Sequence, residues 1–183
     1  MPKYRLFYLL AFLLISFGNF VAQDGSRSWS VGLNSSSVLY SEKDGLVVGG
    51  RHIAIIPGVS LSKYIGNKTT ISFTLSKSIK DSQKYLSSDV NLNYELLNPD
   101  YKLRIYVLSG IGIVNLLETG VTLNLGSGGT LWITDRFGLN GQLIYKLSAL
   151  GGDLQKSHIF GTAGIVYSLN LGGYNSRIWE RKH

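Results

Sequence analysis

The fold is decided by two neighbouring segments, residues 85–97 (YLSSDVNLNYELL) and residues 102–114 (KLRIYVLSGIGIV). In the first segment apolar and polar side chains alternate, as Val90, Asn91 and Leu92 show. A period of two places the two kinds of side chain on opposite faces of a β-strand. The polar face is too polar for the core of an ordinary soluble sheet, so the pattern favours strands that enclose a wet or hydrogen-bonded interior.

The short connection between these segments predicts a β-hairpin, because Pro99 and Asp100 are typical turn residues. A hairpin folded symmetrically about them places Glu95 opposite Arg104 on the polar face. Opposite charges on neighbouring strands stabilise the register, and inside a barrel each charge needs the other to stay ionised. We interpret Glu95 and Arg104 as a structural charge pair of the lumen, with gating or transport as the alternative role.

Six further segments alternate in the same way, and they are residues 28–40, 47–64, 69–79, 119–134, 137–148 and 159–170. The sequence therefore predicts an all-β fold, an eight-stranded antiparallel up-and-down β-barrel that crosses a membrane. Pro57 interrupts the second strand and predicts a β-bulge there. The glycine-rich residues 126–129 are expected to let the barrel wall bend.

The connections support a membrane barrel because their lengths alternate. Turns at Gly66, Pro99 and Asp135 are short, whereas most of the others, near residues 44, 81, 118 and 152, are longer. Outer-membrane barrels have short periplasmic turns and long extracellular loops, and an even strand number leaves both termini in the periplasm. The alternation itself does not tell inside from outside, so a soluble lipocalin-like barrel with an apolar interior remains the alternative.

The N-terminal residues indicate an export signal. Residues 1–22 begin with Lys3 and Arg5, continue with an apolar run that ends at Phe17, and finish at Ala22. That run is shorter than the about 20 residues of a spanning helix, so a signal peptide is favoured. We expect the barrel domain to occupy residues 23–171 and a short basic periplasmic tail to occupy residues 172–183.

Composition narrows the choice of partners. The chain has a formal net charge of +7 and no cysteine, which excludes disulfides, a lipoprotein anchor and a thiolate metal site. Many cations fall at strand ends and connections, which suits outer-membrane lipid headgroups and lipopolysaccharide phosphates, whereas nucleic acid would bring one continuous basic face. A possible contact with an envelope protein partner is assigned to the tail residues Arg177, Trp179, Arg181 and Lys182, with a frayed terminus as the alternative.

Few residues suggest a catalytic, cofactor-binding or metal-binding site. The glycines of residues 110–112 and 126–129 resemble phosphate-binding loops, but neither group opens a helix, so no nucleotide or other cofactor is expected. His52 and His158 lie at strand ends, and we expect them to be rim residues that bond to loops or headgroups. The alternative is an enzyme site in which Asp44, Asp153, Ser157 and loop hydroxyls lie near them. No metal site is expected. Aromatic residues near the strand ends favour interfacial anchoring over a sugar- or lipid-binding platform.

Four stretches carry a family resemblance: WSVG at residues 29–32, residues 57–67 ending in KYIGN, WITDRFGLN at residues 132–140, and the strand from His158 onward. Together they resemble the membrane barrel domain of OmpA-like porin-family proteins of Bacteroidota. The resemblance implies a non-enzymatic outer-membrane barrel, exported through the periplasm, with a structural or accessory role in the cell envelope, including that of a small subunit of a larger complex. The alternatives are a narrow porin gated by the Glu95–Arg104 pair and a surface barrel that contacts lipopolysaccharide, host or phage. Longer members continue into a peptidoglycan-binding domain, which we do not expect here.

Overall fold

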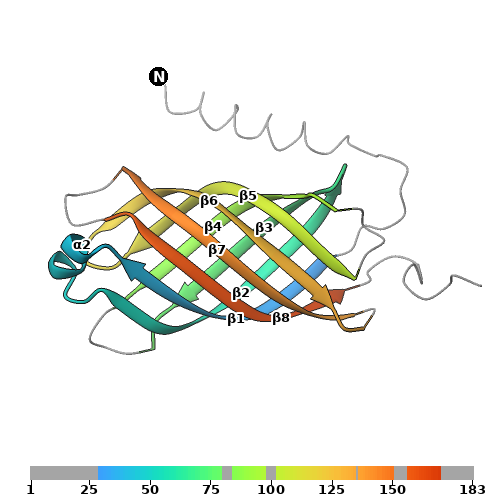
Figure 1. Ribbon diagram of the computed structural model, residues 1–183, viewed down its shortest axis with the longest axis horizontal. Coiled ribbons are helices and arrows are strands. Elements are labelled where there is room, and N and C mark those ends of the chain that lie inside the picture. Colours follow the sequence, from blue (N-terminus) through green and yellow to red (C-terminus); the bar gives the residue numbers. More distant parts are fainter. Residues whose placement is uncertain (1–28, 80–83, 98–101, 135, 151–155, 170–183) are drawn as a thin grey trace, which may run out of the picture.

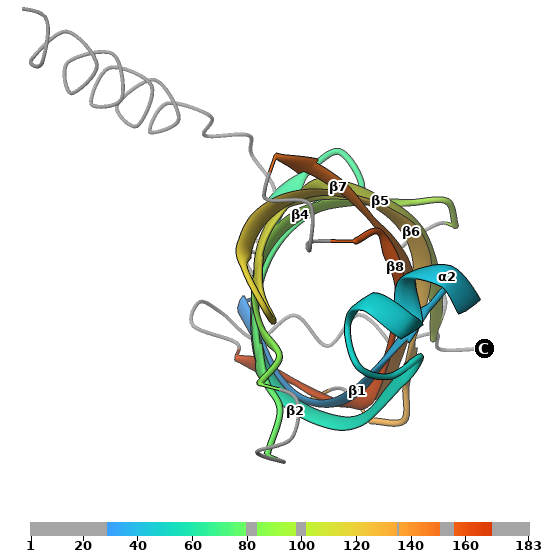
Figure 2. The same cartoon turned by 90° about the vertical axis from the view of Figure 1, so that its left-hand side faces the viewer.

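Eight antiparallel strands close into a barrel (Figure 1). The computed structural model describes residues 29–79, 84–97, 102–134, 136–150 and 156–169. Each strand pairs with the next, and β1 pairs with β8 to close the wall, as the view in Figure 2 shows. The strands are β1 (Trp29–Tyr40), β2 (His52–Gly66), β3 (Thr69–Lys77), β4 (Leu86–Glu95), β5 (Leu103–Asn115), β6 (Thr119–Trp132), β7 (Phe137–Leu150) and β8 (His158–Leu169). The predicted fold class is confirmed.

The two faces of the wall differ in polarity. Large apolar side chains are exposed on the outer wall, among them Leu33, Leu92, Ile111, Leu125 and Leu143. Serine, asparagine and charged side chains on the same strands are buried inside, among them Ser72, Asp89, Asn91, Asn124 and Lys146. A soluble barrel would have the reverse arrangement, so the lipocalin-like alternative is wrong. An apolar exterior on a closed sheet suits lipid, because hydrogen-bonded ladders join each strand to both of its neighbours.

The connections differ between the two ends. At the end where β1 begins and β8 ends, here called the termini end, they are residues 67–68, 96–102 and 133–136. At the opposite end, the loop end, they are residues 41–51, 78–85, 116–118 and 151–157. Two connections depart from the expected lengths: 116–118 at the loop end is short, and 96–102 at the termini end is as long as 151–157. The other connections follow the predicted asymmetry. No helix within the described part of the chain is long and apolar enough to cross a bilayer.

The first loop contains a helix that the sequence pattern did not predict. The second strand was expected from residue 47, but residue 47 is the last residue of α2 (Glu42–Val47) and β2 begins only at His52. Ser41 caps the helix, because its hydroxyl accepts a hydrogen bond from the Asp44 backbone N–H at 3.2 Å. Figure 2 shows α2 at one side of the barrel mouth.

The expected bulge lies before Pro57 rather than at it. Ser36 pairs with Ile56 and Val38 with Ile53, so two residues of β2 oppose one of β1 at this point. Ile55 has a positive φ of 59° and is 67% exposed, whereas Ile53 and Ile56 are buried. The bulge thus turns Ile53 to the inside, although simple alternation placed it on the same face as Ile55.

Pro57 itself sits in the regular part of the β1–β2 ladder, opposite Ser35. The pairing of β2 with β3 begins only at the next residue, Gly58. A proline has no N–H to donate to a neighbouring strand, so it is tolerated where one of the two ladders ends.

The glycine-rich part of β6 makes room for a side chain. Gly128 lies opposite Tyr106 of β5, and a Cβ atom at Gly128 would come within 2.8 Å of the Tyr106 ring. The Asn140 side-chain amide donates a hydrogen bond of 2.8 Å to the Tyr106 hydroxyl. This glycine therefore lets an aromatic ring lie flat against the inner wall, which is a more specific role than the expected bending.

Candidate functional site

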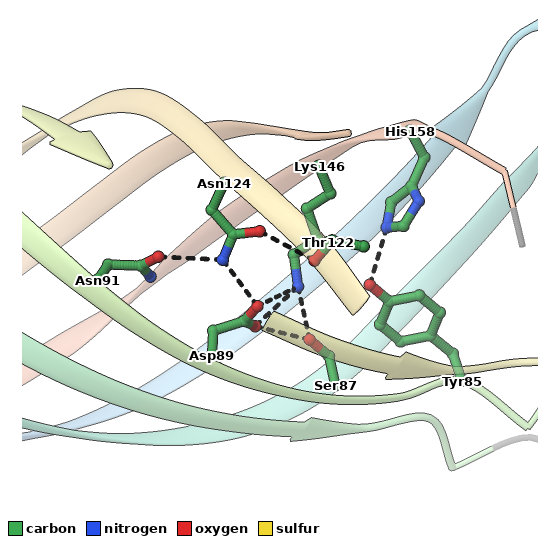
Figure 3. A network of polar contacts seen from close by, with 8 residues as sticks. All are labelled: Tyr85, Ser87, Asp89, Asn91, Thr122, Asn124, Lys146 and His158. Atoms are coloured by element: carbon green, nitrogen blue, oxygen red, sulfur yellow. Dashed lines mark hydrogen bonds and ion pairs between the residues drawn. The ribbon is translucent and has the colours of Figure 1, made fainter. Parts of the chain in front are cut away.

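The centre of the lumen holds a buried ion pair between β4 and β7 (Figure 3). The Lys146 Nζ atom lies 2.8 Å from Oδ1 and 2.7 Å from Oδ2 of Asp89. The Ser87 hydroxyl contacts the Lys146 ammonium and donates a 2.6 Å hydrogen bond to Asp89 Oδ2. The Lys146 side chain is 0% exposed and that of Asp89 is 3% exposed. Two charges withdrawn from water so completely stabilise a fold only when their hydrogen bonds are satisfied, as they are here.

Side-chain amides extend this pair across the lumen to form the central network, which comprises Ser87, Asp89, Asn91, Thr122, Asn124 and Lys146 (Figure 3). Asn124 Nδ2 donates to Asp89 Oδ1 at 2.9 Å and to Asn91 Oδ1 at 3.0 Å. The Thr122 hydroxyl donates to Asn124 Oδ1 at 3.1 Å, which holds the amide in this orientation. Residues from β4, β6 and β7 are thereby joined through the barrel interior.

Aromatic side chains lie beside the central network toward the loop end. The Lys146 Nζ atom lies 4.3 Å from the centroid of the Phe160 ring, and Phe160 stacks on Tyr85 with centroids 6.0 Å apart. Both rings belong to an apolar cluster of buried side chains, which consists of Val38, Tyr40, Val48, Ile53, Ile56, Tyr85, Tyr106, Leu108, Val114, Ile144 and Phe160. The cluster fills lumen space that water or solutes would otherwise occupy.

His158 is an interior residue with two hydrogen-bond partners. Its Nδ1 atom lies 3.0 Å from the Lys156 carbonyl oxygen, and its Nε2 atom lies 2.9 Å from the Tyr85 hydroxyl oxygen. Because a carbonyl can only accept, Nδ1 carries the proton and Nε2 accepts from the Tyr85 hydroxyl. His158 lies at its strand end as expected but is only 1% exposed, whereas His52 is exposed. The first residue of β8 points inward, where Tyr40 and Tyr85 enclose its ring.

Glu95 and Arg104 are brought together, but not directly opposite each other. Tyr106 lies opposite Glu95 in the β4–β5 ladder, which is two residues from the expected register. The β4–β5 ladder is therefore not symmetric about Pro99 and Asp100 as assumed, but a shift of two residues keeps every side chain on its expected face. Arg104 Nη1 therefore reaches Glu95 Oε1 diagonally, at 3.4 Å.

The Glu95–Arg104 pair is more loosely held than the central one. The side chain of Arg104 is 30% exposed, and its guanidinium lies 5.6 Å from the centroid of the Trp132 ring. Glu95 Oε2 and Arg104 Nε are buried without a hydrogen-bond partner among the described residues. A single contact at this distance contributes little, so the two lumenal ion pairs differ in strength.

The other candidates for an enzyme site lie only partly within the described residues. Ser157 accepts a hydrogen bond from the Ser148 backbone N–H, and no cluster of metal-ligating side chains occurs within the described residues. Residues 1–22, Asp153 and the tail with Arg177, Trp179, Arg181 and Lys182 lie outside the described residues. The roles expected for them stay predictions.

The sequence interpretation missed the Asp89–Lys146 pair. Both residues were on the polar faces of their strands, but β4 and β7 are not neighbours in the sheet, so no hairpin rule links them. The available signal was the isolation of Lys146, a cation between the apolar residues Tyr145 and Leu147 in the middle of a strand. A lone inward charge needs a partner of opposite sign.

Comparison with known proteins supports the fold. No protein-family model and no curated protein sequence matches the chain. The N-terminal β-barrel domain of Pseudomonas aeruginosa OprF superposes with a TM-score of 0.56 at 16% identity, covering 76% of this chain and 97% of that domain. Neisserial surface protein A gives 0.55 at 13% identity, with 78% and 96% covered. Ail of Yersinia pestis gives 0.53 at 13% identity, with 80% and 100% covered.

At these identities the likeness concerns the fold. The closed sheet and the apolar outer wall of this chain independently match what a lipid bilayer requires of a barrel. The chain is therefore an eight-stranded β-barrel of the outer-membrane type, with its apolar wall facing lipid and its polar network enclosed.

Proposed function

We propose that this protein is a non-enzymatic barrel with a structural or accessory role in the bacterial outer membrane, either alone or as a small subunit of an envelope complex. The observation that carries the proposal is the filled lumen. The central network joins β4, β6 and β7 through the interior, and the apolar cluster packs beside it. An interior occupied by its own side chains acts as a core, which leaves lipid, lipopolysaccharide and other envelope proteins as the partners of the outer surface.

The assignment to the OmpA-like porin family of Bacteroidota belongs to the same proposal. It rests on the four sequence stretches described above and on the barrel fold. The expected export signal in residues 1–22 agrees with delivery through the periplasm, and the termini end then faces the periplasm.

The first experiment tests folding and location together. Outer membranes from cells that express the full chain are run on a denaturing gel with and without boiling, and a heat-dependent shift in mobility is expected. Recovery in the soluble periplasmic fraction without a shift would contradict the proposal. Purified protein in planar bilayers is expected to give no resolved conductance steps, because the lumen is filled.

A narrow channel is the second candidate, favoured by the exposed part of the loosely bound Glu95–Arg104 pair. Arg104 is 30% exposed and contacts Glu95 through one atom pair at 3.4 Å. Regular conductance steps that change in a Glu95→Gln variant would favour this candidate over the structural role. A surface-binding role of the loop end would instead appear as lost binding after loop deletion, with the heat-dependent shift retained.

A further inference from the structure

We propose that the outer wall at the termini end carries a binding site for the phosphate of an anionic phospholipid, built on Trp29 and Lys63. The inference rests on the proposed function, because it requires that this end of the barrel lies at the periplasmic leaflet. It adds a specific headgroup chemistry and specific residues to that role.

The two residues form one unit across neighbouring strands. Trp29 is the first residue of β1 and pairs with Lys63 of β2. The Lys63 ammonium lies 5.0 Å from the centroid of the Trp29 ring, which is cation–π distance. Val31 and Leu61 are paired two residues further into the wall and are 37% and 41% exposed. The pair therefore marks the point where the apolar wall ends, which is the depth of lipid headgroups.

The chemistry of the pair suits a phosphate. The ring face contacts one side of the ammonium, and a lysine has three N–H donors, so donors remain for an anion on the other side. Among the described residues Lys63 has no ion-pair partner, since the three ion pairs there are Arg51–Glu42, Arg104–Glu95 and Lys146–Asp89. A cation positioned by an aromatic ring at headgroup depth and without a carboxylate favours an anionic over a zwitterionic headgroup.

A second pairing of a cation with an aromatic residue lies on the adjacent strands at the same end. Arg136 Nη1 lies 3.5 Å from the Tyr167 hydroxyl oxygen, and the rings of Tyr167 and Phe137 have centroids 4.8 Å apart. Strand β8, which carries Tyr167, pairs with β1, where Leu169 lies opposite Trp29. Cations and aromatic rings thus lie at the termini end on four neighbouring strands, in the order β2, β1, β8 and the start of β7. The site belongs to a headgroup-level surface rather than to one isolated lysine.

The loop end offers a matched control. Lys77 is the last residue of β3, is exposed, and follows the outward-facing residues Phe73 and Leu75 on the same face. Its neighbour on β4 is Leu86. Lys77→Gln therefore removes the same charge from the outer wall at the other end, while Lys63→Gln removes it beside Trp29.

The experiment measures binding of phosphatidylglycerol and phosphatidylcholine with identical acyl chains to the full-length folded protein in detergent, by native mass spectrometry. The unmodified protein is expected to bind phosphatidylglycerol about fivefold more tightly, the preference that one cation near a headgroup supplies. Lys63→Gln is expected to remove most of this preference, and Lys77→Gln is expected to keep it. Trp29→Leu, which keeps the charge but loses the ring, is expected to weaken the preference as well.

Three results would overturn the proposal. One is equal binding of the two lipids by the unmodified protein, and another is an equal loss of preference in Lys63→Gln and Lys77→Gln, which would mean that overall charge decides. The third is a cross-link in cells from position 63 to a periplasmic polypeptide, combined with a Lys63→Gln variant whose preference for phosphatidylglycerol equals that of the unmodified protein. The heat-dependent gel shift is recorded for every variant, so a failure of the lipid site is distinguishable from a failure of the barrel assignment.

Discussion

Lys146 of β7 and Asp89 of β4 meet inside the barrel, with the ammonium 2.7 and 2.8 Å from the two carboxylate oxygens. The strands that carry them are not neighbours in the wall, so this contact joins the two sides of the sheet through its interior. The pair lies beside the apolar cluster and adds a polar contact to the packed interior. Its consequences can be measured through the stability of the barrel.

Removal of one partner of this pair is expected to destabilise the barrel strongly. Lys146→Met leaves the Asp89 carboxylate buried and uncompensated, and such a loss costs about 3–5 kcal/mol in the free energy of unfolding. The double variant Asp89→Asn/Lys146→Met is expected to be more stable than the single Lys146→Met variant, because no charge is then left unpaired. Urea unfolding in detergent, followed by tryptophan fluorescence, measures both. Additive effects of the two substitutions would contradict a direct interaction.

The second ion pair is expected to matter much less. Glu95→Gln removes a single 3.4 Å contact and leaves its charged partner Arg104 30% exposed rather than fully buried, so the loss should be much smaller than that of Lys146→Met. The same unfolding assay applies, with Lys146→Met as the reference for a strong effect. A loss equal to that reference would show that the Glu95–Arg104 pair, rather than the central network, holds the interior together.

The fit between Gly128 and Tyr106 predicts a size-dependent effect. Gly128→Ala places a methyl group about where the Tyr106 ring lies, and overpacking of this kind costs about 1–3 kcal/mol. Gly141→Ala is the matched control, because the nearest atom to its new Cβ would be 4.0 Å away. A combined Gly128→Ala/Tyr106→Leu variant should recover part of the loss. Equal unfolding midpoints for Gly128→Ala and Gly141→Ala would rule out the steric explanation.

The Tyr85 hydroxyl is expected to stabilise the loop end. Tyr85→Phe keeps the ring packed on Phe160 but leaves the buried Nε2 of His158 without its donor, which costs about 1–3 kcal/mol. Tyr145→Phe alters a hydroxyl on a residue that is 48% exposed on the outer wall, so it should change stability little. A Tyr85→Phe variant as stable as the control would mean that His158 finds another donor.

The sequence alone predicted the eight strands and the polar face of most of them, because an alternating pattern determines a local property of each strand. For Asn91 and Lys146, this period placed the side chain on the polar face of its strand, which the structure turns inward. Local patterns failed where one extra residue changes the phase, as at the Ala54–Ile55 bulge, and where a cap at Ser41 starts a helix.

The partners inside the lumen were decided by the tertiary structure. Tyr106 rather than Arg104 lies opposite Glu95, because the β4–β5 register depends on the geometry of the connection. A shift of two residues leaves every side chain on the same face, so an alternating pattern cannot detect it. Asp89 meets Lys146 only because the sheet closes on itself and brings the interiors of β4 and β7 together. The face on which a side chain lies is therefore determined by its own strand. The contacts across the barrel depend on closure of the sheet, and closure depends on the registers of all eight strands together.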